Sequence, residues 1–384
     1  MKHRSNPSLH RGLRTWIELD REAVRHNVQV MRGLLGRKTR LMAVVKSNAY
    51  GHGLSTFSKL LDGQGLPGQG VYGFCVDSVL EGFRLRKEGI TKPILILGST
   101  LPEHFSAAAE SDIALTISTF EGFEAFLRVA KKPAIHIKID TGMHRQGFFP
   151  AEISKLLKLL KRSKLAPSGA YTHFAAKDWG YPVYTELQFA QFKKALTVFE
   201  RAGFKDLIRH AAASDATLLF PESHLDMVRV GMALYGYWPS WAAKVKHPPR
   251  MHLKPVLTWK TIVSEIKEIP AGSYVGYDLT ERVSRKTKIA VLPIGYWHGY
   301  DRGLSSIGEV LIRGKRRRVL GRVSMDMTVV DVTAIPGVSI GDEVVMIGAQ
   351  GKEAIGADEP ALKIGTSHYE FLTRINPLIE RIVA

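Results

Sequence analysis

The chain has 384 residues, of which 45% are hydrophobic and 23% are charged, and its formal net charge at pH 7 is +18. A chain of this length and apolar content can bury two hydrophobic cores, which excludes a largely disordered protein. Because no run approaches the roughly 20 apolar residues that cross a bilayer, we predict no membrane span and no membrane partner.

The single cysteine, Cys75, lies in an apolar run and has no second cysteine with which to form an intrachain disulfide. This predicts a reducing, cytoplasmic setting. The basic N-terminal segment 1–13 lacks the apolar region of a signal peptide, and we interpret it as an exposed arm. No group of cysteines and histidines has the spacing of zinc ligands, so we expect no metal site.

In chain order, eight apolar runs with the character of β-strands alternate with helical patterns. Eight parallel strands close a TIM-type (β/α)8 barrel, and the stretches between them have the length of right-handed crossovers. The strand-like runs are Leu41–Lys46, Val71–Val76, Pro93–Gly98, Ile113–Ser118, Ala134–Ile139, Ser168–Phe174, Leu207–Ala212 and Met227–Gly231. The clearest helical patterns are Asp20–Leu35, Asp77–Glu88, Ala151–Arg162 and Thr185–Ala202.

After Tyr235 the pattern changes to short alternating runs separated by turn residues, which predicts a mostly β C-terminal domain. These runs are Leu257–Ile266, Lys288–Pro293, Glu309–Ile312, Arg318–Val323, Met327–Val332 and Glu343–Gly348. The segment between the two patterns, Pro239–Pro255, is rich in Pro, Trp and Lys. We therefore predict a (β/α)8 barrel over residues 14–242, followed by a mostly β domain over residues 250–384.

Two sequence features resemble motifs of other functional classes, but their position in the chain does not support those functions. The segment Gly63–Gly68 matches G-x-G-x-x-G, yet a dinucleotide-binding loop must follow a strand and open a helix, and here the order is reversed. The densest basic run, Arg313–Arg318, lies at the tip of a predicted hairpin over Glu309–Leu320. Since the other basic residues are scattered and do not gather with aromatic residues, we predict a solvated basic surface and no nucleic-acid partner.

Lys46 follows five apolar residues and precedes small residues and glycines. A lysine at the end of a buried strand is desolvated, and burial favours the neutral amine, which condenses with aldehydes. The alternative is an ordinary lysine whose amine reaches water from a strand end.

Several other polar residues follow predicted strands, where the active site of a β/α barrel is assembled. In the fifth strand, Ile135, Ile137 and Ile139 alternate with polar residues, which directs His136, Lys138 and Asp140 into the barrel. Lys138 and Asp140 could instead form a structural ion pair.

Phosphate groups in barrels often bind at the loops after the seventh and eighth strands. Ser214 is a natural helix N-cap there, and Gly231 allows close approach of backbone. The alternative for Ser214 is a plain N-cap. Arg229 is flanked by Met227, Val228 and Val230, which favours burial over a surface position.

Ordered motifs along most of the chain resemble the alanine racemases. They include Ala43–Gly53, which is similar to the pyridoxal-phosphate attachment motif, and Thr15–Asp20, Lys138–Arg145, Tyr171–His173, His210–Ser214, Met227–Gly231, Gly321–Asp326 and Tyr369–Glu370. The resemblance implies a pyridoxal 5'-phosphate enzyme that interconverts L-alanine and D-alanine, an isomerase that supplies D-alanine for peptidoglycan of the cell wall.

The resemblance also implies a role for each site residue. Lys46 would carry the cofactor as an aldimine. The other cofactor-binding residues would be Tyr50, Arg145, His173, Ser214, Arg229, Gly231, Met232 and Tyr369. The substrate-binding residues would be Arg145, Tyr296, Met325 and Asp326. Lys138 corresponds to a lysine that is carbamylated in some members.

Racemisation requires two acid/base groups on opposite sides of the substrate. The resemblance assigns them to Lys46 and Tyr277, with the tyrosine contributed by the second subunit of a homodimer that shares its active sites. An isolated tyrosine has a pKa of about 10, so we expect positive neighbours, His173 and Arg229, to acidify Tyr277.

The chain departs from the family at several positions. Ala213 replaces a usual asparagine, and His144 replaces a common glycine. Asp278, Trp297 and His298 are also atypical and are expected near the site entrance. They leave substrate preference more open than reaction type. The alternatives are therefore a racemase of broader substrate range, a barrel-type amino-acid decarboxylase, or a basic nucleic-acid-binding protein. A decarboxylase would place a carboxylate on the pyridine nitrogen, where the resemblance places Arg229.

Overall fold

The computed structural model describes residues 12–63, 70–176, 181–248 and 251–384. The segment Gly63–Gly68 and the predicted arm over residues 1–13 lie almost wholly outside these residues. The chain forms two compact units. The barrel unit contains Glu22–Ser47 and Phe57–Lys254, and the β-rich unit contains a segment ending at Arg21, Asn48–Thr56 and Pro255–Ala384.

The barrel unit contains the eight predicted strands, all parallel, in the order β8-β7-β6-β5-β4-β3-β2-β9. An isolated parallel bridge between Ala213 and Arg229 nearly closes the ring. The strands are β2 (Arg40–Val44), β3 (Gly73–Val76), β4 (Ile94–Ile96), β5 (Ile113–Ile117), β6 (Ile135–Lys138), β7 (Gly169–Tyr171), β8 (Ile208–His210) and β9 (Met227–Val230). The predicted (β/α)8 barrel is thereby confirmed.

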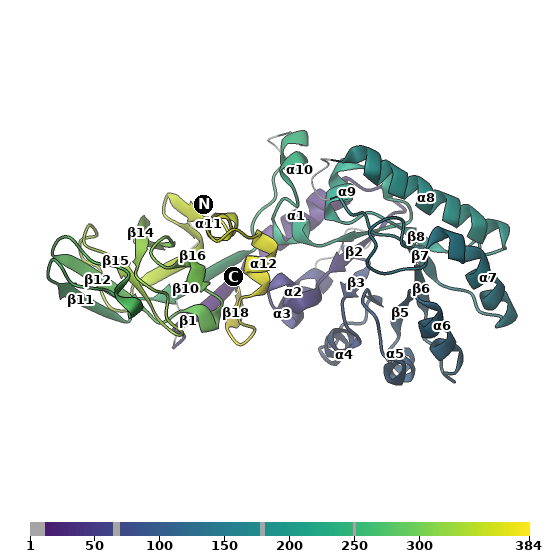
Figure 1. Ribbon diagram of the computed structural model, residues 1–384, viewed down its shortest axis with the longest axis horizontal. Coiled ribbons are helices and arrows are strands. Elements are labelled where there is room, and N and C mark those ends of the chain that lie inside the picture. Colours follow the sequence, from purple (N-terminus) through teal and green to yellow (C-terminus); the bar gives the residue numbers. More distant parts are fainter. Residues whose placement is uncertain (1–11, 64–69, 177–180, 249–250) are drawn as a thin grey trace. The chain divides into compact units, whose positions relative to one another are not determined.

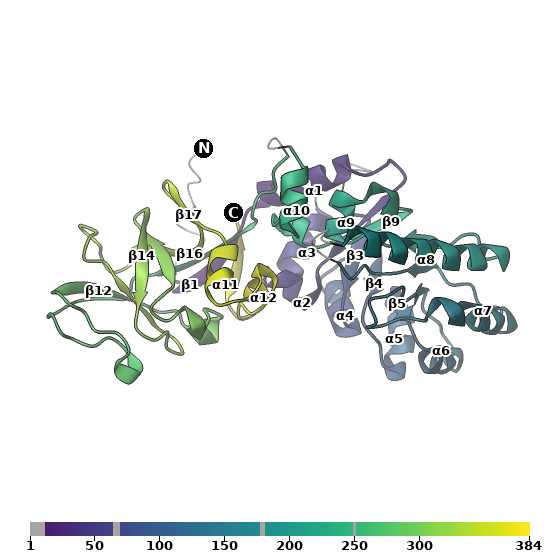
Figure 2. The same cartoon turned by 45° about the horizontal axis from the view of Figure 1, so that its top comes forward.

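Helices lie between the strands and outside the ring (Figures 1 and 2). They are α1 (Arg21–Gly33), α2 (Lys46–Tyr50), α3 (Leu54–Asp62), α4 (Val79–Lys87), α5 (Phe105–Glu110), α6 (Phe120–Leu127), α7 (Ile153–Arg162), α8 (Pro182–Arg201), α9 (Ser214–Leu219) and α10 (Trp241–Lys246). The sequence sets where they begin: Ser78 caps α4 in a capping box with Glu81, and Thr119 caps α6. In the described residues no helix has the length and apolarity needed to cross a membrane.

The β-rich unit contains a sheet in the order β11-β12-β15-β14-β13-β16-β10-β1-β18, with β17 paired to β16. The strands are β1 (Thr15–Leu19), β10 (Leu257–Ile262), β11 (Glu265–Ile269), β12 (Thr287–Leu292), β13 (Glu309–Ile312), β14 (Lys315–Leu320), β15 (Thr328–Asp331), β16 (Glu343–Gln350), β17 (Glu353–Ile355) and β18 (Glu380–Val383). Two helices, α11 (Asp358–Lys363) and α12 (His368–Thr373), follow β17. The predicted mostly β character is confirmed.

Three details of this unit differ from the predicted elements. The predicted strand Leu257–Ile266 is two strands, because the chain changes partners at Val263–Ser264: β10 pairs with β16, and β11 pairs with β12. The strand β14 begins at Lys315, since the hairpin turn needs only Arg313 and Gly314, both at positive φ. Finally, β1 pairs with β10 and β18, so it lies in this sheet although the predicted barrel range began at residue 14.

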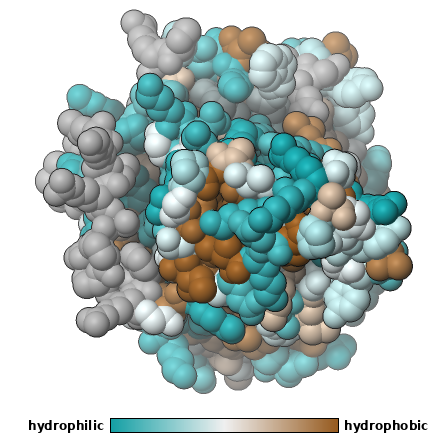
Figure 3. All heavy atoms as spheres, turned by 90° about the vertical axis from the view of Figure 1, so that its left-hand side faces the viewer, coloured by the Kyte–Doolittle hydropathy of each residue, from teal (hydrophilic) through white to brown (hydrophobic). Residues whose placement is uncertain are grey.

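A small apolar cluster supports the outer strands of this sheet. It consists of Val275, Val283, Ile289 and Leu320, with Ile269 and Val329 packed against it. Figure 3 looks onto the end of the molecule where β11, β12 and β15 lie, and it shows hydrophobic residues gathered near the centre of that face. The four buried residues of the cluster are themselves only 2–7% exposed, so the unit's own residues cover them.

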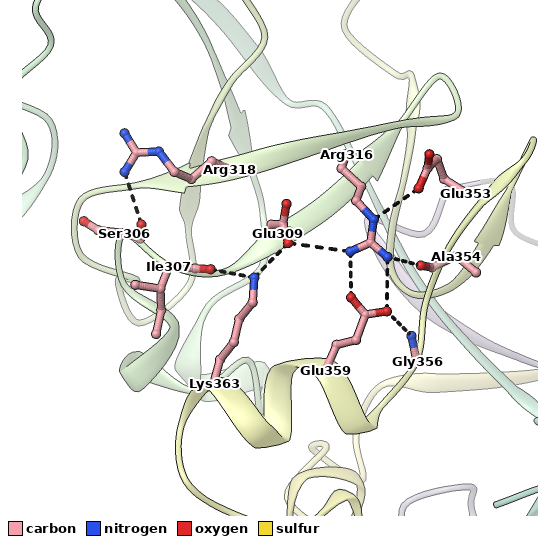
Figure 4. Close-up of polar contacts among 10 residues, drawn as sticks. All are labelled: Ser306, Ile307, Glu309, Arg316, Arg318, Glu353, Ala354, Gly356, Glu359 and Lys363. Atoms are coloured by element: carbon pink, nitrogen blue, oxygen red, sulfur yellow. Dashed lines mark hydrogen bonds and ion pairs between the residues drawn. The ribbon is translucent and has the colours of Figure 1, made fainter.

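The basic run at the β13–β14 hairpin is neutralised by neighbouring carboxylates. Arg316 makes two hydrogen bonds to Glu359, of 2.6 and 3.1 Å, and one of 3.1 Å to Glu353 (Figure 4). In the same run, Arg313 pairs with Asp342 and Arg318 pairs with Glu281. The side chains of these three arginines are still 45%, 32% and 51% exposed, so the surface is solvated as predicted. Its positive charge is balanced by acidic residues distant in sequence that fold against it.

Candidate active site

Lys46 lies just after β2, in the barrel unit, and is half-exposed. Its Nζ lies 3.2 Å from Oδ1 of Asp77, and 36% of its side chain is exposed. Of the two interpretations of Lys46, the structure agrees with the amine that reaches water, because it leaves the end of the strand and meets a carboxylate. Asp77, which directly follows β3, was missed by the sequence analysis, although the same strand-end rule would have selected it.

The turn after Lys46 has an unusual backbone. Four consecutive non-glycine residues, Ser47 to Tyr50, have φ between 50° and 55°, so α2 is a left-handed turn. This conformation costs roughly 1–2 kcal/mol per residue, which other contacts must offset. The Ser47 N–H donates to Glu81, and the Asn48 side chain accepts from the Leu54 N–H. The ring of Tyr50 meets that of Tyr369 edge-on, with centroids 6.3 Å apart, so both predicted phosphate-binding tyrosines lie together.

A buried ring, Tyr171 on β7, organises the inside of the barrel. The His210 ring stacks on it at 4.7 Å and 7°. Lys138 Nζ lies 4.8 Å from the ring centroid and Arg229 Cζ lies 4.9 Å from it. Neither Tyr171 nor His210 had an assigned role in the sequence analysis. Both residues could have been selected from the sequence, because they belong to two of its motifs and lie at the ends of two neighbouring strands.

Arg229 is 3% exposed, which excludes the surface alternative. Its guanidinium donates to His210 Nδ1 at 2.7 Å, to the Thr172 carbonyl at 2.8 Å and to the Ala211 carbonyl at 3.0 Å. Burial and the Arg229 charge hold the pKa of His210 well below its usual value, so the imidazole is neutral and accepts at Nδ1. Its Nε2 lies 2.8 Å from Nδ1 of His136. The neutral rings of His210 and His136 thus form a hydrogen-bonded chain that orients the buried guanidinium of Arg229.

Lys138 is 6% exposed, and burial followed by repulsion from Arg229 and Arg145 lowers its pKa to about 7. Within the described part of the chain it forms no ion pair with Asp140, so the structural-pair alternative is contradicted. Asp140 instead accepts four backbone N–H bonds of 2.9–3.0 Å from residues 142–145. Burial opposes ionisation of Asp140, but these bonds lower its pKa overall.

These bonds shape the loop that carries Arg145. A small pocket is lined by Lys138, Ile139, Asp140, Met143, Arg145, Gln146 and His173. The exposed Arg145 guanidinium makes no hydrogen bond to any residue that the structure describes. It is therefore available to a ligand at this pocket. His144 in the same loop has a φ of 54°, a conformation that glycine adopts without steric cost.

His173 is neutral rather than positively charged. Burial, and then repulsion from Arg229 and Lys138, hold its pKa well below the usual value. The expectation that His173 supplies positive charge to Tyr277 was therefore wrong, and Arg229 is the remaining candidate of the two.

Ser214 is the first residue of α9, and its predicted N-cap position is occupied by Ala213, which makes no side-chain cap. The Ser214 hydroxyl accepts instead from the Gly231 N–H at 2.9 Å. This bond joins the two segments predicted to bind phosphate. Met232 follows directly and begins a short 3-10 helix, Met232–Tyr235.

The remaining candidates lie in the β-rich unit and are exposed. Tyr277 is 68% exposed and Met325 is 55% exposed. Backbone bonds from Tyr296 to the Ser324 carbonyl and from Trp297 to the Met325 carbonyl join two of the candidate segments. Asp278 pairs loosely with Arg322 at 3.5 Å, which brings the Tyr277 segment to the same stretch. Met325 and Asp326 therefore lie in the segment 321–326, and the segments that carry Tyr277 and Tyr296 contact it.

Comparison with known proteins identifies relatives over almost the whole chain. Residues 19–239 match the family described as "Alanine racemase, N-terminal domain", and residues 256–383 match "Alanine racemase, C-terminal domain". The alanine racemase of Carboxydothermus hydrogenoformans is 41% identical over 96% of this chain and 98% of its own. That of Leptospira interrogans is 38% identical over 96% and 95%. The solved alanine racemase of Bacillus anthracis with bound L-Ala-P has a TM-score of 0.90 and 34% identity, covering 97% of this chain and 95% of that one.

Proposed function

The chain belongs to the alanine racemase family, whose members are pyridoxal-phosphate-dependent isomerases, and we propose that it interconverts L-alanine and D-alanine by a two-base mechanism. The observation that carries this proposal is Arg229, a buried cation that neutral His210 and backbone carbonyls hold at the centre of the barrel. Burial lowers its pKa, yet a guanidinium stays charged at neutral pH.

The residues of the barrel fit the cofactor. Bound pyridoxal phosphate supplies an aldehyde that condenses with amines and a ring that withdraws electrons from the substrate Cα. We assign Lys46 to the aldehyde and Arg229 to the ring nitrogen. The phosphate would be held by Ser214, Gly231, Met232, Tyr50 and Tyr369, and His173 would contact the ring. A permanent cation at the ring nitrogen keeps a proton from that nitrogen, which limits side reactions such as transamination.

Each of the two bases would exchange a proton with one side of the substrate Cα. Lys46 Nζ would take or return the proton on one side, and Asp77, 3.2 Å away, would hold the protonated amine. The Tyr277 hydroxyl would do the same on the other side. Arg145 would orient the substrate carboxylate with a guanidinium that has no other hydrogen bond in the described chain. Tyr296, Met325 and Asp326 would line the path by which the substrate enters.

We assign Lys138 as a carbamylation site. Because its pKa is about 7, a large fraction of its amine is neutral at physiological pH and can attack carbon dioxide. An N–C bond forms and one proton leaves to solvent. The resulting anion would lie beside the positive charges of Arg145 and Arg229, which now lower the amine's pKa. Mass spectrometry under native conditions should detect a mass increase of about 44 Da that Lys138→Met abolishes.

We propose a homodimer in which Tyr277 serves the barrel of the other copy. The exposure of Tyr277 and its neighbours supports this, since a residue used by another subunit must face outward. A complementation experiment tests it. When Lys46→Ala and Tyr277→Phe chains are mixed and reassembled, half of the dimers contain one intact site, so about a quarter of wild-type activity should return. Mixtures with no more activity than either variant would contradict a shared site.

The substrate is tested by chiral analysis of products from a panel of L-amino acids. Alanine should be converted fastest, and carbon dioxide should not form. Release of carbon dioxide would identify a decarboxylase, and faster conversion of another amino acid would identify a racemase of different range. We assign the D-alanine product to peptidoglycan synthesis and the enzyme to the cytoplasm, in keeping with its buried, reduced Cys75.

A further inference from the structure

The left-handed turn after Lys46 is anchored by the last strand of the chain. Arg381, on β18, donates to the Gly51 carbonyl from Nη2 at 2.9 Å and from Nε at 3.3 Å. Its Nη1 donates to the Asn376 carbonyl at 2.8 Å and also to the Ile379 carbonyl. One planar guanidinium thus joins the carbonyl that follows Tyr50 to the carboxyl-terminal segment.

The surroundings leave the turn little freedom. A Cβ at Gly51 would lie 2.0 Å from the Leu372 carbonyl oxygen, and a Cβ at Gly53 would lie 3.2 Å from Cγ of Arg381. His52 is fully buried, and its Nδ1 lies 3.1 Å from the Tyr50 carbonyl. Burial lowers the pKa of His52 to about 3, so a neutral ring donates this bond. The turn is therefore packed against α12 and β18 on the side where Arg381 binds.

Arg381 carries out no evident task other than this one. Among the residues that the structure describes, no carboxylate lies within ion-pairing distance of its guanidinium, and its bonds all go to backbone carbonyls. Burial lowers its pKa to about 10. A lysine could not bind these three carbonyls in the same way. Its ammonium is a compact charge and lacks the planar, spread set of N–H donors that a guanidinium has.

We propose that Arg381 is a positioning residue that holds the left-handed turn through the Gly51 carbonyl and so fixes Tyr50 for the cofactor. The role of Tyr50 in this statement rests on the proposed function. The anchoring itself does not depend on it.

Hydrogen exchange of the full-length protein tests the anchoring directly. In Arg381→Lys, amides in residues 47–54 should exchange about tenfold faster, while amides of β10 and β16 stay unchanged. The dissociation constant for pyridoxal phosphate should rise about tenfold, measured by titration of its absorbance. Arg313→Lys is the matched control, since Arg313 lies in the same unit but binds Asp342 at the surface. Exchange and affinity equal to those of this control would overturn the proposal.

A second variant covers the case in which Arg381→Lys does not fold. Ala49 has a φ of 51°, so Ala49→Gly removes backbone strain from the turn. The double variant should fold and exchange more slowly than Arg381→Lys, because a relaxed turn needs less anchoring. A double variant that unfolds or exchanges like Arg381→Lys would contradict the proposal. Since exchange needs no substrate, a protein that fails to racemise alanine but shows these changes would refute only the proposed function.

Discussion

The two units present their candidate residues in opposite ways. In the barrel unit, Arg229 and Lys138 are 3% and 6% exposed, and contacts within the chain fix their surroundings. In the β-rich unit, Tyr277 and Met325 are 68% and 55% exposed. Within the barrel unit, the chain itself therefore fixes the positions of the buried cationic side chains. The β-rich unit instead presents side chains outward, which suits residues that complete a site on another molecule.

This difference predicts that the barrel residues control cofactor binding, whereas the exposed Tyr277 controls the chemical step alone. Lys46→Ala should give the largest effect. Activity should fall by about 10³-fold or more, because one base and the covalent attachment are both lost. The visible absorbance of the bound cofactor should also disappear. Lys59→Ala is the control, since Lys59 also pairs with one carboxylate, Glu88, at the surface. A variant that keeps the absorbance would refute the assignment of Lys46.

Tyr277→Phe should separate proton transfer from cofactor binding. Racemisation should fall by about 10²- to 10³-fold, since one proton-transfer group is missing, while cofactor absorbance and affinity stay unchanged. The rate of proton removal from L-alanine and the rate of proton removal from D-alanine should fall by unequal factors. Tyr274→Phe, which alters another exposed tyrosine of the same segment, should leave both rates unchanged. Loss of cofactor in Tyr277→Phe would remove the contrast between the units.

Arg316→Gln tests whether the β-rich unit is held by its own charge network. Loss of the bidentate bond to Glu359 and the bond to Glu353 should lower the free energy of unfolding by about 1–3 kcal/mol. Cofactor affinity should not change. Urea unfolding measures the first and absorbance titration the second, with Arg285→Gln as an exposed control. A stability equal to that of the control would show that the network in Figure 4 contributes nothing.

The last prediction concerns the pH dependence of the stability of the barrel. The pKa of Lys138 is about 7 in the folded chain and 10.5 when unperturbed, so between these values the unfolded chain binds more protons. This group therefore makes stability rise with pH by up to about 1.4 kcal/mol per pH unit in that window. In buffer free of carbon dioxide, Lys138→Met should flatten the slope and stabilise the protein at pH 6. An exposed control, Lys158→Met, should keep the slope; an unchanged slope in Lys138→Met would contradict the lowered pKa.

Sequence patterns predicted the barrel strands because strands buried on both faces appear as continuous apolar runs, and the polar residues that end them share one rim. The same patterns could not predict the state of Lys46, since its ion pair depends on where Asp77 lies on the next strand. They also missed Arg381, because nothing local distinguishes an arginine that binds a distant carbonyl. Pairing of Arg316 with Glu353 and Glu359 was missed for the same reason. Local periodicity reports burial, whereas partners distant in sequence are set by the fold.

The parallel pairing of β1 with β18 has a consequence for biosynthesis. Thr15–Leu19 is synthesised more than 350 residues before Glu380–Val383, the strand with which it pairs on this edge. The first strand must therefore wait, unpaired on this edge, until the ribosome has made its partner. Substitutions in Glu380–Val383 should consequently change the protection of Thr15–Leu19.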